Sequence, residues 1–151
     1  MPGVDADAEV DALRFLKSPQ CYGVAAGEVR WIETHMSWVF IVRDEVLKLK
    51  KPLRSRYLDH SSPALREFDC REELRLNARL APGVYLGLAA LQRTASGYRL
   101  LREEALPAPG ETVDWLVRMR RLPEDHRLDR CIAQRRIDAP RIEALAAVLG
   151  R

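Results

Sequence analysis

The fold is decided by residues 46–83, which read VLKLKKPLRSRYLDHSSPALREFDCREELRLNARLAPG. Residues 46–51 set apolar side chains against lysines in near alternation, which indicates a β-strand that Pro52 ends. Two further strands are expected before it, because residues 29–34 alternate and residues 38–42 are aromatic and β-branched. Short polar connections join the three segments, so they are expected to form an antiparallel meander.

The second part of the same stretch carries the signals of a long helix. Ser62 can cap the helix, Pro63 suits its first turn, and the acidic residues Glu67 and Asp69 follow. The sequence Ala-Pro-Gly then predicts the end of the helix near Leu80.

The residues after the helix complete the sheet. Residues 84–91 and 113–119 are expected to be strands, and residues 98–101 can pair back after a Ser-Gly turn. Short helices are expected at residues 7–17, 128–135 and 142–149. One long helix inserted after the third strand of an antiparallel sheet is typical of the α+β class. We therefore expect an α+β fold with a five-stranded antiparallel sheet, one long helix after strand 3 and short flanking helices.

Composition narrows the functional classes. Apolar residues make up 47% of the 151 residues, which is enough for the core of one domain. The net charge of +3 is too small to argue for nucleic acid, and no apolar run approaches the roughly 20 residues that span a bilayer. The three widely spaced cysteines fit neither a disulfide framework nor a metal site, so we expect reduced thiols and a cytoplasmic protein.

Five separate stretches together resemble a known family, the bacterial aminoglycoside-phosphotransferase-like proteins. They are ETHMSWVF (33–40), LKLKKP (47–52), CREELRLNARLAP (70–82), VYLG (84–87) and VRMRRLP (117–123). In that group a protein-kinase-like domain is often fused to a C-terminal P-loop ATPase. The resemblance covers nearly the whole chain, and its five motifs occur in the order that the family shows.

The resemblance implies the N-terminal lobe of a protein-kinase-like fold, which binds ATP beneath five antiparallel strands and one helix. It also implies a division into an N-terminal helical segment (1–22), the kinase-like N-lobe (23–122), and a linker with the first helices of a C-lobe (123–151). The cofactor would be ATP, with Mg²⁺ if the C-lobe is present, and the acceptor an unidentified small molecule with a hydroxyl group. A P-loop ATPase domain is a further expected partner.

Lys48 is the expected phosphate ligand. A kinase holds the α- and β-phosphates with a lysine on its third strand and steadies that lysine with a glutamate on the next helix. The Val-Leu-Lys sequence ending at Lys48 resembles the motif that carries this lysine, and Lys50 lies on the same face of the strand. Lysines are mostly exposed in proteins, so the competing interpretation is that both face water. The resemblance favours Lys48 as the ligand, whereas for Lys50 we prefer the solvated interpretation.

Glu73 matches the glutamate of the helix, three residues after Cys70. Periodicity leaves Glu72 open as an alternative, because Glu72 falls within the helix's apolar stripe and Glu73 at its edge. The stripe is formed by Leu65, Phe68, Leu76 and Leu80.

Three further residues are expected to contact the nucleotide. Ser37 ends the 34–37 loop, which replaces a glycine-rich phosphate loop but has no glycine; its hydroxyl can donate to phosphate. The resemblance puts Val117 and Met119 at the inter-lobe linker, where they would line the adenine pocket, although an ordinary buried strand end is the competing interpretation. His35 in the same loop is expected to be structural or solvated rather than a phosphate ligand.

Two alternatives to an enzyme remain open from the sequence. The family's second lobe supplies an aspartate base and a metal-binding aspartate. No His-Gly-Asp-like loop follows Pro123, so we expect this chain alone not to transfer phosphate. The chain is then either the ATP-binding lobe of a phosphotransferase or a catalytically dead interaction or regulatory module. RNA binding through the arginines around residues 118–130 is a weaker third option, because no base-stacking aromatics lie among them.

Overall fold

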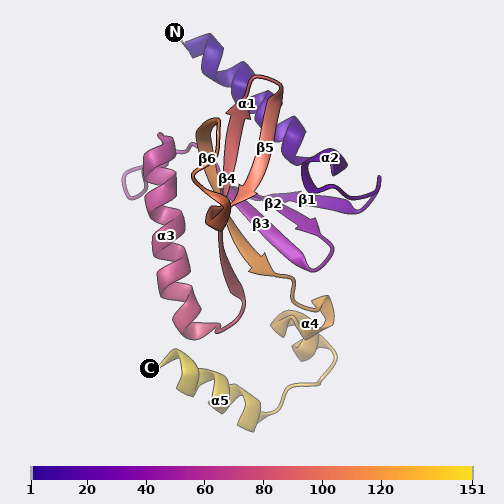
Figure 1. Ribbon diagram of the computed structural model, residues 1–151. Coiled ribbons are helices and arrows are strands. Elements are labelled where there is room, and N and C mark those ends of the chain that lie inside the picture. The colour runs from indigo at the N-terminus through magenta and orange to yellow at the C-terminus, as the bar shows by residue number, and fades with distance from the viewer. Residues whose placement is uncertain (1, 151) are drawn as a thin grey trace.

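A computed structural model describes the backbone of residues 2–150 and the side chains of residues 7–150. Met1 and Arg151, the outermost residues of the expected first and third segments, lie outside the described residues. A six-stranded antiparallel sheet is covered on both faces by helices (Figure 1). Helices α1 (Pro2–Leu16) and α2 (Pro19–Tyr22) cover one face, and α3 (Pro63–Leu80) covers part of the other.

The sheet joins a three-stranded N-terminal meander to a two-stranded hairpin through one further strand. Its order is β1-β2-β3-β6-β4-β5, and every neighbouring pair is antiparallel. The last strand in the chain therefore lies between β3 and β4 and joins the N-terminal meander to the β4–β5 hairpin. The strand bounds are β1 Val29–Glu33, β2 Ser37–Val42, β3 Glu45–Lys50, β4 Tyr85–Thr94, β5 Gly97–Arg102 and β6 Glu111–Arg120.

The expectation of five strands is wrong, because β5 is a full member of the sheet. Its residues pair with β4 from Ala89↔Arg102 to Thr94↔Gly97. Gly97 has φ +125°, a conformation that few other residues adopt, and it lets the chain reverse tightly. Residues 98–101 were expected only to pair back after the turn, because four residues make a short segment for a separate strand. The α+β class itself is as expected.

Helix α3 has the predicted bounds but not the expected orientation of its apolar stripe. The Ser62 hydroxyl accepts a hydrogen bond from Leu65 N at 3.3 Å, which caps the helix as predicted. The stripe, however, faces solvent, since Phe68 is 62% and Leu80 48% exposed. The face that packs on the sheet carries Arg66, Cys70 and Glu73 instead, because ion pairs there replace apolar contact.

Two apolar clusters hold the layers together, one on each face of the sheet. Leu16 of α1 packs with Phe40, Leu47, Ala89, Leu91 and Leu116 on the first face. Cys70 of α3 packs with Leu88, Ala90, Trp115 and Val117 on the second. Because α3 packs chiefly against β6 and β4, Val39 and Val46 on the same face of β2 and β3 stay partly exposed.

The C-terminal helices lie apart from the sheet. After β6, a short turn (Glu124–His126) leads to α4 (Leu128–Ala133) and then to α5 (Ala139–Leu149), which lies beyond the lower end of α3 in Figure 1. Helix α4 is shorter than the expected 128–135, and α5 begins earlier than the expected 142–149. Neither helix has a buried side chain. Among residues 2–150, no helix combines the length and apolar character needed to cross a membrane.

Candidate functional site

Three rows of side chains run across the open part of the sheet, from β2 through β3 to β6. The register pairs Ile41 with Val46 and Val46 with Met119 in the first row. Residues two apart on a strand share a face, so the next rows lie on the same face as the first. The second row pairs Val39 with Lys48 and Lys48 with Val117, and the third pairs Ser37 with Lys50.

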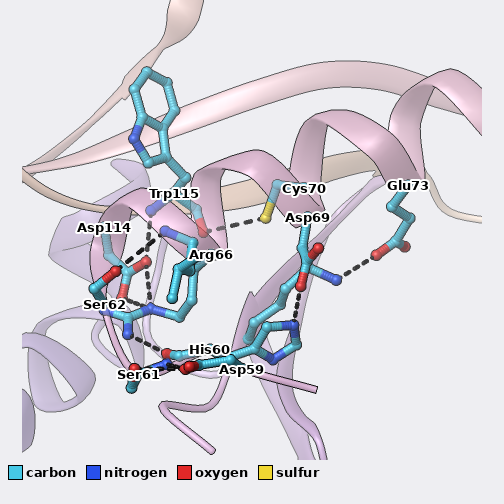
Figure 2. Close-up of polar contacts among 12 residues, drawn as sticks. Asp59, His60, Ser61, Ser62, Arg66, Asp69, Cys70, Glu73, Asp114 and Trp115 are labelled. Atoms are coloured by element: carbon cyan, nitrogen blue, oxygen red, sulfur yellow. Dashed lines mark hydrogen bonds and ion pairs between the residues drawn. The ribbon is translucent and has the colours of Figure 1, made fainter. Parts of the chain in front are cut away.

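The lysines of the second and third rows meet one glutamate from α3. Lys48 Nζ donates a short hydrogen bond to Glu73 Oε1, and Lys50 Nζ donates to Glu73 Oε2 at 2.8 Å. The side chains of Lys50 and Glu73 are 11% and 12% exposed, and that of Lys48 is 26% exposed. Figure 2 shows the side chain of Glu73 projecting from α3, with a hydrogen bond drawn to its carboxylate. The structure therefore brings together Lys48 and Glu73 as predicted.

Lys50 differs from its expected solvated state, because it is the more buried of the two lysines and holds the second oxygen of Glu73. Sequence pattern could not separate the two lysines, since both lie on one face of β3. The deciding contact comes from a helix 23 residues further along the chain.

Glu73, not Glu72, is the inward glutamate. Burial opposes ionisation of Glu73, but the hydrogen bonds from Lys48 and Lys50 outweigh it, so the pKa of Glu73 lies below its ordinary value. Glu72 instead accepts hydrogen bonds from Arg75 on the exposed side of α3, at 2.7 Å from Nη2. The carboxylate of Glu73 is thus held ionised between two ammonium groups.

A buried ion pair fixes the helix that presents Glu73. Arg66 Nε donates to both carboxylate oxygens of Asp114 on β6 at 3.0 Å, and Arg66 Nη1 donates to the carbonyl of His60 at 2.8 Å (Figure 2). Burial raises the pKa of Asp114 despite this pairing. One turn on, the Cys70 thiol points to the carbonyl of Trp115 at 3.8 Å, and burial raises the pKa of this thiol to about 12.

The loop before α3 is tied to the helix by a second polar contact. His60 is 4% exposed, and its Nε2 lies 2.5 Å from Asp69 Oδ2 (Figure 2). Its Nδ1 is buried and has no hydrogen-bond partner among the described residues. Together with Arg66, this contact holds the start of α3 against the sheet.

Ser37 lies where β2 leaves the tight 34–37 turn. Its backbone N–H donates to Thr34 Oγ1 at 2.9 Å, and the Thr34 hydroxyl donates in turn to the Ser37 carbonyl at 2.9 Å. The turn is therefore closed by threonine rather than opened by glycine. The Ser37 hydroxyl has no hydrogen bond within the described residues and shares the face of its register partner, Lys50.

The first row provides a half-buried apolar surface beside the lysines. Val39, Ile41, Val46 and Met119 are all partly exposed there. Val117, by contrast, is 0% exposed and packs under α3 with Cys70 and Leu88, so it does not line this surface as expected. The sequence reading missed Val39, Ile41 and Val46. Counting positions in steps of two from Lys48, and across the hairpin, would have found them.

The arginines around the linker are mostly paired. Arg118 is buried and its Nη2 lies 3.1 Å from Glu45 Oε1. Arg127 pairs with Asp129 at 2.9 Å and Arg130 with Glu124 at 3.4 Å. A solvated or salt-bridged face therefore describes this basic run better than a nucleic-acid surface.

A cavity of about 320 Å³ lies on the opposite face of the sheet. Its lining includes Tyr22, Glu45, Leu100, Arg102 and Arg118. Arg118 alternates with Val117 along β6 and so points away from the lysines. Glu45 accepts hydrogen bonds from Arg102 and Arg118, at 3.0 and 3.1 Å, and Glu104 lies 3.9 Å from Arg118, so two carboxylates face two arginines here.

The lysine cluster suits an anion better than it suits a metal ion. Two ammonium groups and a hydroxyl lie on one face of the sheet, beside the partly exposed apolar side chains of the first row. Among residues 7–150, no three His, Cys, Asp or Glu side chains gather closely enough to hold a metal. The donor set is thus one for an anion with an apolar portion.

Comparisons with known proteins find relatives of unknown function. The chain is 38% identical over 66 residues to uncharacterised proteins from Mycobacterium bovis and from two strains of Mycobacterium tuberculosis. The matched segment covers 44% of this chain and only 13% of the length of each relative. No family model matches the chain. No solved structure matches it either.

Proposed function

We propose that this chain is the ATP-binding lobe of a protein-kinase-like phosphotransferase that acts on a small molecule with a hydroxyl group. The observation that carries the proposal is the ion pair between Lys48 on the third strand and Glu73 on the helix that follows it. Phosphoryl transfer depends on a positive charge held still against the phosphates, and this pairing is how a kinase holds its lysine.

The apolar row beside Lys48 supports a nucleotide rather than a simple anion. An adenine ring over Val46 and Met119 would leave its phosphates one row further along β3, at Lys48. Successive rows are about 6.6–6.8 Å apart, a spacing compatible with the sugar-phosphate part of a nucleotide. The positive charge and the apolar surface thus lie next to each other in the order that ATP requires.

Within this proposal, the remaining groups of the reaction come from residues outside these 151. Lys48 binds and orients the phosphates, and Glu73 holds Lys48. Mg²⁺, the aspartate base and the acceptor site would belong to a second lobe, and a P-loop ATPase domain is a further proposed partner of the longer protein. The proposal includes a cytoplasmic location, which suits the free thiols of Cys21, Cys70 and Cys131.

Binding of ATP by the purified chain tests the proposal. We expect the wild-type chain to bind ATP and Lys48→Ala to bind it about tenfold more weakly, because a charge-assisted hydrogen bond to phosphate is lost. Isothermal titration calorimetry, or NMR titration for millimolar affinities, gives the dissociation constants.

Lys51→Ala is the matched control. Lys51 is the next lysine along, but it pairs with Glu33 at 2.5 Å and lies on the other face of the sheet, near Trp38. The substitution removes the same charge from the chain without touching the site. Equal losses in the two variants, or no ATP binding by the wild type, would contradict the proposal.

One observation favours the alternative, an interaction or regulatory module without catalysis. The apolar stripe of α3 is exposed, and α5 exposes a second apolar set that includes Ile142, Leu145 and Leu149. Such a module would bind little nucleotide and would self-associate or bind a partner through these helices. Analytical ultracentrifugation of the wild type and of Phe68→Asp would then show a larger species that the substitution disrupts.

A further inference from the structure

We propose that Lys50 is a second phosphate-binding lysine, which recognises the terminal phosphate of a nucleoside triphosphate while Lys48 holds the phosphates nearer the sugar. This inference rests on the proposed function, because it assigns a role within the same nucleotide site. It makes the site selective for the number of phosphates in the ligand.

The charges in the cluster leave room for an anion. Two ammonium groups face one carboxylate, so the group carries one net positive charge although Lys50 and Glu73 are nearly nine-tenths buried. Uncompensated charge is costly in a partly desolvated site, and a bound anion removes that cost.

Neighbouring carboxylates on α3 do not supply the missing negative charge. Asp69 contacts His60, and Glu72 pairs with Arg75 on the outer side of the helix. On β6, Asp114 is held by Arg66 at 2.9 Å. Each of these acidic groups has its own cationic or imidazole partner, so the excess charge at Lys48 and Lys50 is left for a ligand.

The order of the rows assigns Lys50 to the distal phosphates. Along β3, the face carries Val46, then Lys48, then Lys50, from the apolar surface toward the 34–37 turn. A nucleotide whose ring lies over Val46 therefore extends past Lys48 before it reaches Lys50, which is two rows, or about 13 Å, from the apolar end. Only a ligand with a chain of phosphates reaches that far.

Ser37 lies beside Lys50, at the end of the site assigned to the distal phosphates. It is the register partner of Lys50, is buried to 7% exposure, and has a hydroxyl that no described residue engages. Because the 34–37 turn has no glycine, close approach of backbone N–H groups to phosphate is restricted. An ammonium and a hydroxyl at this position replace what a glycine-rich loop would donate.

The test measures the affinities of AMP, ADP and ATP for the wild-type chain, Lys48→Met and Lys50→Met, each checked for folding by its NMR spectrum. Methionine keeps the length of the side chain and removes the charge. We expect Lys50→Met to weaken ATP about tenfold and ADP by no more than about threefold, with AMP unchanged. Lys48→Met should weaken ATP and ADP alike. Lys50→Arg, which keeps the charge, should restore most of the ATP affinity.

The outcomes separate this inference from the proposed function. If Lys48→Met weakens binding but Lys50→Met does not, or weakens ATP and ADP equally, the role of Lys50 is overturned while the nucleotide site stands. If the wild type binds none of the three nucleotides, both are overturned. Should Lys50→Met fail to fold, the wild-type amide signals of Ser37 and Lys50 decide: they should shift on adding ATP and stay in place on adding AMP.

Discussion

Glu73 is one carboxylate shared by two lysines, and this arrangement sets the pH dependence of the site. The pKa of Glu73 in the folded chain lies below its ordinary value, because the hydrogen bonds from Lys48 and Lys50 outweigh the effect of burial. A depressed carboxyl pKa contributes stability that is fully present above the unfolded value of about 4.3 and is lost as the pH falls through the folded pKa.

We therefore expect Glu73→Gln to lower the free energy of unfolding at pH 7 by about 2–3 kcal/mol, since it leaves two partly buried ammonium groups without their partner. The difference from the wild type should start to shrink below about pH 4.3, where the unfolded chain takes up the proton, and should be lost as the pH falls through the lower pKa of Glu73 in the folded chain. Urea denaturation at pH 7 and near pH 3.5 measures both values.

Glu72→Gln is the control for this prediction. Glu72 also has a lowered pKa, chiefly because Arg75 hydrogen-bonds to it, but it lies on the exposed side of the helix. Its replacement should change stability much less. A larger loss for Glu72→Gln than for Glu73→Gln, or a loss at Glu73 that is the same at both pH values, contradicts the account of the cluster.

At the level of elements, α3 is held by its ion pairs and a small apolar contact rather than by its apolar stripe. Phe68 is 62% exposed, whereas Phe40 of β2 is 0% exposed in the core beneath α1. We expect Phe68→Ala to cost less than about 1 kcal/mol and Phe40→Ala about 3–5 kcal/mol, because only the second opens a cavity. Thermal or urea denaturation of both variants measures this. Similar costs at the two positions would mean that the stripe of α3 is packed.

Local signals predicted the elements better than their orientations. The Ser-Pro start of α3 was identifiable because a capping hydroxyl and a first-turn proline act within a few residues. The inward face of α3 was not identifiable, because the charge of the buried Arg66 is balanced by Asp114, which lies 48 residues away in the sequence. Hydrophobic periodicity assumes that apolar side chains face the core, and here paired charges occupy that face.

The count of strands failed for a related reason. Residues 97–102 become a strand because β4 extends to Thr94 and offers a complete edge for pairing. When a segment becomes a strand because the neighbouring strand is long enough to pair with it, its own residues predict that strand poorly. For the candidate site, the pair Lys48 and Glu73 was predictable from the motif, whereas the burial of Lys50 and of Val117 depended on packing between distant segments.

At the scale of the whole molecule, the two faces of the sheet have different roles. Helices α1 and α2 close one face with an apolar core, whereas α3 packs chiefly against β6 and β4 on the other, so that the first row of side chains on β2 and β3 stays partly exposed. The candidate nucleotide site therefore lies on the α3 side, and the cavity lined by Glu45 and Arg118 lies on the opposite side.

Mapping where ATP binds tests this assignment most directly. In a ¹⁵N NMR titration of the wild-type chain with ATP, the account predicts the largest shifts at the amides of Val46, Lys48 and Lys50 on β3, at Met119 on β6 and at Glu73 on α3. Shifts confined to Tyr22, Leu100 and Arg102, around the cavity on the other face, or no shifts at any ATP concentration up to the millimolar range, would contradict it.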